Sequence, residues 1–349
     1  MMDDRSDGII LVMGVTGAGK SYFINQLKSE SAVEGHSLYS GTISPLFAPK
    51  TFQINEFYII ETQKCQAVQI FLDDEDDDEK RSITVIDTPG FDDTLRDEAE
   101  IVAEIADYLA AQHLTGLPLR GILYLHKITE NRITASSQKH LYLLRKIIGD
   151  SALTNVILVT TMWNVLRRED RQRALQREQE LIDNFWGHMI DRGAYVAQFN
   201  GTPQSAYPLV HQLADQQSVV LDIQKEIVDQ DRSLLETAAG ATLAQKLRDD
   251  HEAHQLNLFS LHDQLDRKQR EQPPLDKVEI RRLKNDIKAT EKLLAAISCS
   301  VEIMEIRPGS PIRQRVKLAM KEHGATAITA LGMVLNIALF TVRMSLGGM

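Results

Sequence analysis

The sequence predicts an α/β fold with a mostly parallel sheet, followed by an all-α C-terminal extension. Two observations support this prediction. As far as about residue 215, short apolar runs alternate with segments of helical periodicity, which is typical of parallel strands covered by helices. From residue 217 to residue 271 there is no proline and one glycine, Gly240, and apolar residues recur at spacings of three and four, which is typical of long helices.

The alternation sets the expected elements. Apolar runs indicate strands at residues 8–13, 65–72, 82–86, 121–125, 155–161 and 194–199. Helical periodicity indicates helices at residues 20–29, 96–113, 136–148, 168–185 and 204–215. The second and third strands form a pair, because the charged run DDEDDDEKR between them suits a hairpin tip in solvent. Strands alternating with helices predict a parallel sheet with both faces covered.

The region after residue 215 predicts two long helices that meet at a proline turn. The first covers residues 217–271, and the second follows Pro273 and Pro274, which break a helix. The spacing indicates a helical hairpin or coiled coil, although Gln230 and Thr290 stand at seam positions. Packing onto the α/β part and a free coiled coil both stay open. The expected division is a domain at 1–215, a helical hairpin or coiled-coil extension at 216–322 and an apolar C-terminal helix at 323–349.

Composition and charge narrow the class of protein. The 349 residues carry a net charge of −10, whereas a nucleic-acid binder usually presents a basic face, so we expect no nucleic-acid partner. The two cysteines, Cys65 and Cys299, offer no disulfide framework and no metal-ligand spacing, which suits a reducing compartment. The acidic N-terminal residues MMDDRSDG lack the apolar core of a secretory signal. We therefore expect a cytoplasmic protein.

The C-terminal segment at residues 325–342 contains no charged residue and approaches the length of a bilayer span. Basic residues precede it, which favours a cytosolic location for its N-terminal side; they are Arg307, Arg313, Arg315, Lys317 and Lys321. One interpretation is a tail anchor that holds the α/β domain at the cytosolic face of a membrane. The other is a buried helix that covers the α/β domain or the hairpin.

A phosphate-binding loop is indicated by GVTGAGKS, which fits the pattern G-x-x-x-x-G-K-[ST] between an apolar strand and a helix. Glycines let backbone N–H groups close around phosphate oxygens, and the helix N-terminus adds partial positive charge. Lys20 would reach the β- and γ-phosphates, and the Ser21 hydroxyl would bind Mg²⁺. The candidate nucleotide-binding residues here are Gly14, Val15, Thr16, Gly17, Ala18, Gly19, Lys20, Ser21 and Tyr22.

Two further segments complete the expected phosphate and metal site. DTPG follows an apolar strand, so Asp87 would hold Mg²⁺ through water and Gly90 would offer its backbone N–H to a γ-phosphate. Between the two motifs, GHSLYSGT ends at Thr42, which a mobile loop would bring to Mg²⁺ and the γ-phosphate. The expected ligands are therefore Mg²⁺ with GTP or GDP.

Together these segments resemble the septin-like branch of GTPases, which includes the immunity-associated (AIG/GIMAP-type) GTPases, the septins, chloroplast-envelope receptor GTPases and fungal relatives. The similar stretches are GVTGAGKS, GHSLYSGT, ITVIDTPGFDDT, GILYLHKITENRI, NVILVTTMWN and Ser205-Ala206. LHKITENRI and TTMWN indicate the fungal-like immunity-associated group. The resemblance implies a Ras-like P-loop GTPase domain, Thr42 as the first-switch threonine, Ser205 and Ala206 at the base pocket, and a nucleotide-dependent homodimer or homo-oligomer formed through the nucleotide face.

Residues 160–164, TTMWN, stand where such GTPases read guanine with Asn or Thr, Lys, any residue and Asp. The candidate base-binding residues are Thr161, Met162, Trp163 and Asn164. Asn164 has one acceptor and one donor, so it satisfies one guanine donor and faces the other with its own NH₂. We expect weakened guanine selectivity, with the donor and acceptor of Asn164 better suited to xanthine. Trp163 either covers the base or packs under the loop.

The catalytic site lacks the glutamine that orients the attacking water in Ras-type enzymes, because Phe91 stands at that position. We expect slow hydrolysis, with Lys20, Thr42 and Gly90 at the phosphates. Candidates supplied across a dimer are His126, Lys127 and Arg132, of which an arginine would neutralise transition-state charge. The main hypothesis is a slow GTPase acting as a switch or assembly protein. The alternatives are a pseudo-GTPase scaffold and an ATP-using P-loop enzyme.

Overall fold

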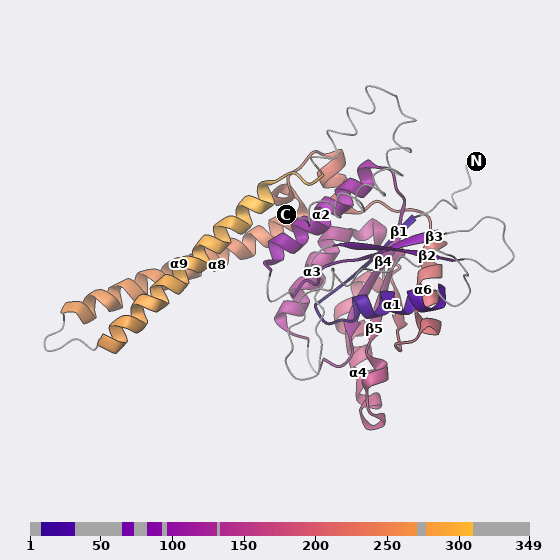
Figure 1. Cartoon of the computed structure of the whole chain (residues 1–349), viewed down its shortest axis with the longest axis horizontal. Coiled ribbons are helices and arrows are strands. Elements are labelled where there is room, and N and C mark those ends of the chain that lie inside the picture. Colours follow the sequence, from indigo (N-terminus) through magenta and orange to yellow (C-terminus); the bar gives the residue numbers. More distant parts are fainter. Residues whose placement is uncertain are drawn as a thin grey trace, which may run out of the picture.

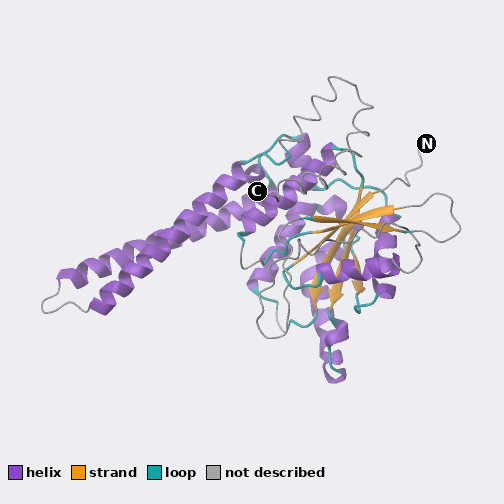
Figure 2. Ribbon diagram, in the orientation of Figure 1, coloured by secondary structure: helices purple, strands orange, loops and turns teal. Residues whose placement is uncertain are grey.

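The computed structural model describes residues 8–31, 65–72, 82–92, 96–130, 133–270 and 277–309. It consists of an α/β body and a long helical hairpin that projects from one side (Figures 1 and 2). The predicted fold class, a mostly parallel α/β domain followed by an all-α extension, is confirmed.

The described strands form one six-stranded sheet in the order β2-β3-β1-β4-β5-β6. β1 pairs in parallel with β3 and β4, and the parallel ladder continues through β5 and β6, whereas β2 runs antiparallel to β3. The carboxyl ends of five strands therefore meet at one edge, where open α/β sheets bind their ligands. The strands are β1 (Gly8–Gly14), β2 (Gln66–Phe71), β3 (Ser82–Asp87), β4 (Leu119–Lys127), β5 (Val156–Thr161) and β6 (Tyr195–Gln198).

Two hydrophobic cores lie on the two faces of the sheet. Helices α1 (Lys20–Ser31) and α6 (Pro203–Ala214) cover one face, and their apolar residues form one buried cluster with alternate strand residues. Helices α2 (Glu98–Leu114) and α3 (Ala135–Ile148) cover the other face within the larger cluster. All seven residues of β1 are buried, as expected for a parallel strand with helices on both sides.

The chain between β4 and β6 carries several short helical turns. Turns of 3₁₀-helix lie at Asp150–Asn155, Trp163–Val165 and Arg168–Asp170. Helix α4 (Arg171–Leu181) then passes into a π-helical turn (Ile182–Trp186) and α5 (Gly187–Ile190), within the stretch where the sequence predicts one helix at 168–185. Ala174 and Leu181 of α4 join the larger core, and the buried Glu178 contacts Thr160 of β5.

The predicted continuous helix from residue 217 is wrong, because the chain breaks into short segments before the hairpin. They are α7 (Asp222–Gln224), a π-helical turn (Lys225–Asp229) and a 3₁₀-helix (Leu234–Glu236). Asp231 has φ 54°, a left-handed conformation that interrupts the helix. Ile223 and Ile227, which contribute to the helical spacing of apolar residues after residue 217, belong to the larger core of the α/β body.

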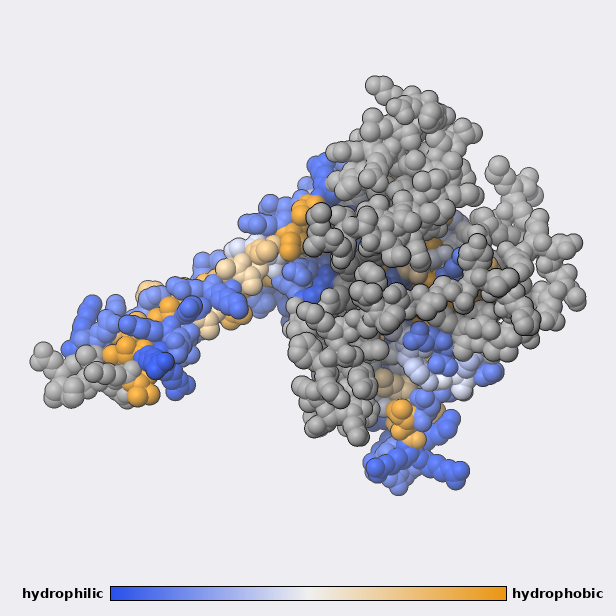
Figure 3. Space-filling model, in the orientation of Figure 1, coloured by the Kyte–Doolittle hydropathy of each residue, from blue (hydrophilic) through white to orange (hydrophobic). Residues whose placement is uncertain are grey.

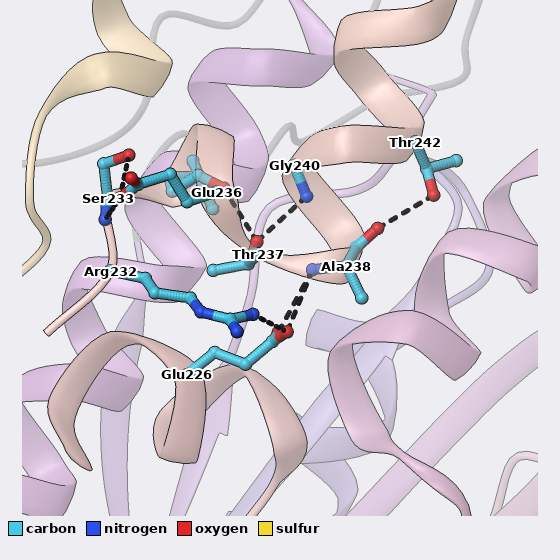
Figure 4. Close-up of polar contacts among 9 residues, drawn as sticks. Glu226, Arg232, Ser233, Glu236, Thr237, Ala238, Gly240 and Thr242 are labelled. Carbon is cyan, nitrogen blue, oxygen red and sulfur yellow. Dashed lines mark hydrogen bonds and ion pairs between the residues drawn. The ribbon is translucent and has the colours of Figure 1, made fainter. Parts of the chain in front are cut away.

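A polar junction fixes the point where the hairpin begins (Figure 4). Helix α8 (Ala238–Arg270) starts above Glu226, whose carboxylate accepts the Ala238 N–H at 3.1 Å and an Arg232 N–H at 3.0 Å. Thr237 donates its hydroxyl to the Leu234 carbonyl at 2.7 Å and accepts the Gly240 N–H at 3.0 Å. A Cβ on Gly240 would stand 1.8 Å from that carbonyl oxygen, so only glycine permits this close approach.

The hairpin of α8 and α9 (Lys277–Glu305) has an inner and an outer half. In the inner half, Leu243 and Leu247 join the core of the body. In the outer half, Leu261, Leu283 and Ile287 form a separate small cluster. Thus the inner half packs on the domain and the outer half is a free hairpin. Figure 3 shows apolar residues at the surface along the hairpin. On α8 and α9, Phe259 is 77% exposed and Val278 78% exposed.

Helix α9 returns to the body at its C-terminal end, where Ser300 donates its hydroxyl to Asp97 and the Gly309 N–H is donated to Asp107 at 2.7 Å. Within the described ranges, no helix combines the length and apolar composition required for crossing a bilayer. The predicted C-terminal helix at 323–349, with the uncharged segment 325–342, lies outside the described residues.

Candidate nucleotide-binding site

The loop between β1 and α1 has the backbone shape of a phosphate cradle. Gly14, Gly17 and Gly19 have φ values of 146°, 76° and 90°, conformations that favour glycine. Among the described residues, chain neighbours aside, no atom lies within 4 Å of the place where a Cβ on Gly17 or Gly19 would stand. The two glycines therefore leave room beside the backbone at the N-terminus of α1, where a phosphate is favoured.

Lys20 lies inside this cradle. Its side chain is 6% exposed, and its ammonium donates to the carbonyl oxygens of Gly14 and Val15, each at 3.2 Å. Both acceptors belong to the loop itself, so the charge is held over the concave side of the glycine turn. An ammonium at this position suits phosphate oxygens, which are stronger acceptors than carbonyls.

Ser21 and Asp87 meet at the expected metal site. The Ser21 hydroxyl donates to Asp87 Oδ2 at 2.6 Å, and Asp87 is 5% exposed at the end of β3. Oxygen ligands of this kind are the ones that Mg²⁺ prefers, usually with waters and phosphate oxygens completing the shell. The residues present therefore fit a magnesium ion bound beside a phosphate group.

The DTPG segment packs directly on the phosphate loop. Thr88 donates both its N–H and its hydroxyl to Val12 O, and the Phe91 N–H is donated to Gly14 O at 3.4 Å. A Cβ on Gly90 would lie 2.4 Å from Thr16 Oγ1 and 2.5 Å from Thr16 N. The absence of a side chain at Gly90 thus permits contact between this segment and the loop.

The Phe91 side chain is buried in the larger core. It is 2% exposed and stacks on His140 of α3, with ring centroids 6.0 Å apart. His140 Nε2 lies 3.2 Å from Glu98 Oε1, and Lys246 of α8 pairs with Glu98 Oε2 at 2.6 Å. A chain of contacts therefore joins the residue after DTPG to the helical hairpin.

The two partners of Glu98 control its charge. Burial alone would raise the pKa of the Glu98 carboxyl, but hydrogen bonds from His140 and Lys246 outweigh burial and lower the pKa. Burial alone would lower the pKa of the Lys246 ammonium. The hydrogen bond and the charge of the Glu98 carboxylate outweigh burial, so the Lys246 pKa is raised. Each group thus keeps the other ionised in the folded protein.

The TTMWN segment contacts the phosphate loop through Thr161. The Thr161 hydroxyl donates to Ala18 O at 2.8 Å, which joins two segments 143 residues apart in the sequence. Met162 adopts a left-handed conformation with φ 66°, and its sulfur accepts the Thr129 hydroxyl at 3.8 Å. The end of β5 is therefore held beside the phosphate loop, as a base-reading segment requires.

The next two residues separate into a buried and an exposed position. Trp163 is 4% exposed and belongs to the larger core, so it packs under the loop, the second of the two arrangements left open by the sequence. Asn164 is exposed and lies against Gly201, where an added Cβ would stand 2.5 Å from Asn164 Nδ2. Tyr22 donates its hydroxyl to Gly201 O at 3.1 Å, so α1 contacts the same corner.

The loop after β6 supplies residues that the sequence reasoning did not identify. Gly201, with φ 86°, faces Asn164, and the only sequence signal is a glycine shortly after an apolar run. Ser205 donates its hydroxyl to Thr202 O at 2.8 Å and helps to cap α6, while Ala206 is fully buried in the smaller core. Both predicted residues thus fix the loop and helix that carry Gly201.

The end of β4 and its following turn lie at the same edge of the sheet. Lys127 pairs with Glu130 at 3.0 Å, and His126 is 6% exposed, with Nε2 4.0 Å from Glu130. Burial lowers the pKa of His126 and Lys127 adds to this effect, while the Glu130 carboxylate opposes it. His126 is therefore a neutral, enclosed group. Thr42 and Arg132, the remaining predicted site residues, lie outside the described residues.

The Ras-like sheet order, the glycine cradle, the buried lysine and the Ser21–Asp87 pair define a P-loop nucleotide-binding protein. Within that class, the model of the AIG1 family matches residues 9–232, and the chain belongs to the AIG1 family. The match begins in β1 and ends at Arg232, shortly before α8 begins at Ala238.

Solved structures with a similar fold include Toc33 from Arabidopsis thaliana in complex with GDP and Mg²⁺, with a TM-score of 0.43 and 14% identity over 62% of this chain and 88% of that chain. A dimerization-deficient mutant of Toc33 gives a TM-score of 0.42 and 15% identity over 61% and 84%. Translation elongation factor SelB from Methanococcus maripaludis, in complex with the GTP analogue GPPNHP, gives 0.35 and 11% over 62% and 35%. No curated protein matches the chain.

Proposed function

We propose that this protein binds guanine nucleotide with Mg²⁺ and hydrolyses GTP slowly. The observation that carries the proposal is the phosphate cradle, in which open glycines and the buried Lys20 lie beside the Ser21–Asp87 pair. In this reading Mg²⁺ neutralises phosphate charge, Ser21 and Asp87 hold the ion, and Lys20 binds the β- and γ-phosphates. Membership of the AIG1 family supports the same assignment.

The corner formed by Asn164, Gly201 and Tyr22, here called the base corner, supports binding of guanine with reduced selectivity over other purines. Asn164 lies exposed beside Gly201 and next to the end of β5, so its side-chain amide is available to a purine edge. An amide in place of a carboxylate loses one charge-assisted hydrogen bond to guanine, which is worth about 1.5–3 kcal/mol. A xanthine base, whose 2-position accepts, would recover that bond.

The position of Phe91 supports slow hydrolysis. Its ring is buried against His140, so within the described residues this position offers no group that orients a water at the γ-phosphate. Thr42 and Gly90 then remain as the proposed γ-phosphate contacts of this chain, with Arg132 as a group donated across a dimer. Catalysis of this kind would depend on positioning and charge neutralisation.

The proposed cellular role is a nucleotide-controlled switch or assembly protein that forms homodimers through the nucleotide face. TTMWN and LHKITENRI support a place in the septin-like branch, within the fungal-like immunity-associated group. The sequence holds two cysteines, Cys65 and Cys299, too few for a disulfide framework, and this composition supports a cytoplasmic location. We also propose that the uncharged segment 325–342 attaches the protein to a cytosolic membrane face.

A direct test combines identification of the bound nucleotide with a competition experiment. Mass analysis of the nucleotide that copurifies with the full chain should find GDP or GTP. Competition among GDP, XDP and ADP in the presence of Mg²⁺ should place ADP last. Tightest binding of ADP would instead favour an ATP-using P-loop enzyme.

A second candidate is a pseudo-GTPase scaffold that binds nucleotide without turnover, and the burial of Phe91 favours it. Single-turnover measurement with excess protein separates the two functions. GTP that stays intact over many hours, at a protein concentration high enough for dimers, would select the scaffold. Release of phosphate that depends on protein concentration would select the slow GTPase.

A further inference from the structure

We propose that Glu178 of α4 is a positioning residue for base recognition, because its buried carboxylate ties together the two loops that flank the base corner. The inference rests on the proposed nucleotide-binding function and assigns it a specificity-determining group. Glu178 is 8% exposed, and its α4 neighbours Ala174 and Leu181 belong to the larger core, on the face of the sheet opposite α1. It therefore acts through other residues rather than on the nucleotide.

Each carboxylate oxygen of Glu178 has one donor, and the donors come from neighbouring strands. Thr160 of β5 donates its hydroxyl to Oε1 at 2.6 Å, and Gln198 of β6 donates its amide to Oε2 at 2.5 Å. Thr160 and Gln198 are register partners in the β5–β6 ladder. The carboxylate thus bridges the ends of both strands in charge-assisted hydrogen bonds, which are the stronger kind.

The bond from Thr160 continues to the base-reading loop. Thr160 Oγ1 also accepts the indole N–H of Trp163 at 3.0 Å. A hydroxyl has a single proton, and an ionised carboxylate only accepts, so donation to Glu178 leaves the hydroxyl lone pairs facing the indole. Because an indole only donates and a carboxylate only accepts, the bonds run in one direction, from Trp163 through Thr160 to Glu178. This chain of bonds thus links Glu178 to the residue before Asn164.

The bond from Gln198 fixes the opposite side of the corner. Gln198 ends β6, and three residues later Gly201 lies against the side chain of Asn164. One buried carboxylate therefore sets both the indole beneath the TTMWN loop and the strand that leads to Gly201. Loss of the carboxylate should let the two loops shift relative to each other while the phosphate cradle keeps its own contacts.

The test uses the full chain with Glu178→Gln and the matched control Glu180→Gln, an exposed residue of the same helix. A glutamine here turns both charge-assisted bonds into weaker neutral ones, and the Gln198 amide must turn over so that its oxygen accepts the new NH₂. Calorimetric titration with Mg²⁺ and either GDP or pyrophosphate separates base from phosphate binding. We expect the Kd for GDP to rise about ten- to hundredfold and that for pyrophosphate to change by less than about twofold in Glu178→Gln.

The control should match the wild type with both ligands. Equal weakening of GDP and pyrophosphate binding in Glu178→Gln would overturn the inference, as would no change in either. If Glu178→Gln does not fold, Thr160→Val removes only the hydroxyl that links Glu178 to Trp163. This variant should also weaken the binding of GDP and leave the binding of pyrophosphate nearly unchanged. A wild-type chain that binds neither ligand would refute the proposed function itself, which is a separate result.

Discussion

Ser21 and Asp87 lie 66 residues apart in the sequence and are joined by a hydrogen bond of 2.6 Å. The bond brings a hydroxyl at the start of α1 to a carboxylate at the end of β3. Two oxygen groups from separate segments thus converge beside the phosphate loop, and we expect nucleotide binding there to depend on magnesium.

Removal of the Ser21 hydroxyl should abolish the benefit of magnesium. We expect Ser21→Ala to bind GDP with similar affinity in Mg²⁺ and in EDTA, whereas the wild type should lose at least about tenfold in EDTA. Ser21→Thr keeps the hydroxyl and is the matched control. A Ser21→Ala protein that retains the full magnesium effect would remove Ser21 from the metal site.

A side chain at Gly90 should disrupt the phosphate loop. The added Cβ of Gly90→Ala would meet the backbone of Thr16 at 2.5 Å, and a backbone atom cannot rotate away. We expect the affinity for GDP to fall and the free energy of unfolding to decrease by about 1–3 kcal/mol. Gly187→Ala is the control, because its Cβ would be 3.4 Å from its nearest neighbour; comparable losses in both variants would contradict the packing explanation.

Restoring the carboxylate in the base loop should sharpen guanine selectivity. Asn164→Asp supplies two acceptors to the two donors of guanine, so we expect GDP to bind about ten- to hundredfold more tightly than to the wild type. XDP should lose affinity in the same variant because its 2-position accepts. Parallel titrations with GDP, XDP and ADP check this, and an unchanged ranking would place Asn164 away from the base.

A glutamine at position 91 should not create a faster enzyme. Phe91 is enclosed by the core, so Phe91→Gln would bury an amide and leave a void, with an expected cost of about 3 kcal/mol or more. Phe91→Leu should cost less, about 1–2 kcal/mol. Denaturant unfolding and single-turnover hydrolysis are the measurements. A stable, faster Phe91→Gln protein would show that this segment reaches the nucleotide.

The Glu98 cluster predicts a loss of stability in acid. Because the folded pKa of Glu98 lies below its ordinary value of 4.5, the unfolded chain takes up the proton first as the pH falls. The contribution is complete above pH 4.5 and is lost as the pH drops through the lower folded pKa. Glu98→Gln should therefore flatten the pH dependence of unfolding below 4.5, whereas Glu252→Gln, an exposed control, should not.

The sequence was sufficient for the sheet and the phosphate loop because their signals are local. GVTGAGKS requires particular glycine conformations within a few residues, and Gly14, Gly17 and Gly19 adopt them. The alternating apolar runs likewise report burial on both faces of each strand. Such patterns need no knowledge of distant contacts.

Other features depend on contacts that leave no spacing in the sequence. Ile223 and Ile227 show helical spacing whether they face a hairpin or the body, so periodicity could not reveal the break at Asp231. The link from Glu178 to Thr160 and Gln198 joins three elements through tertiary packing alone. Gly201 beside Asn164 is equally a consequence of sheet order, which places β5 next to β6.

The most direct test is the affinity of the full chain for GDP with Mg²⁺, measured by calorimetry for the wild type and for Lys20→Ala, with the exposed Lys139→Ala as control. If the buried Lys20 ammonium binds phosphate, Lys20→Ala should weaken GDP at least about tenfold, and Lys139→Ala should match the wild type. Equal affinity of Lys20→Ala and the wild type would contradict a nucleotide site in this loop.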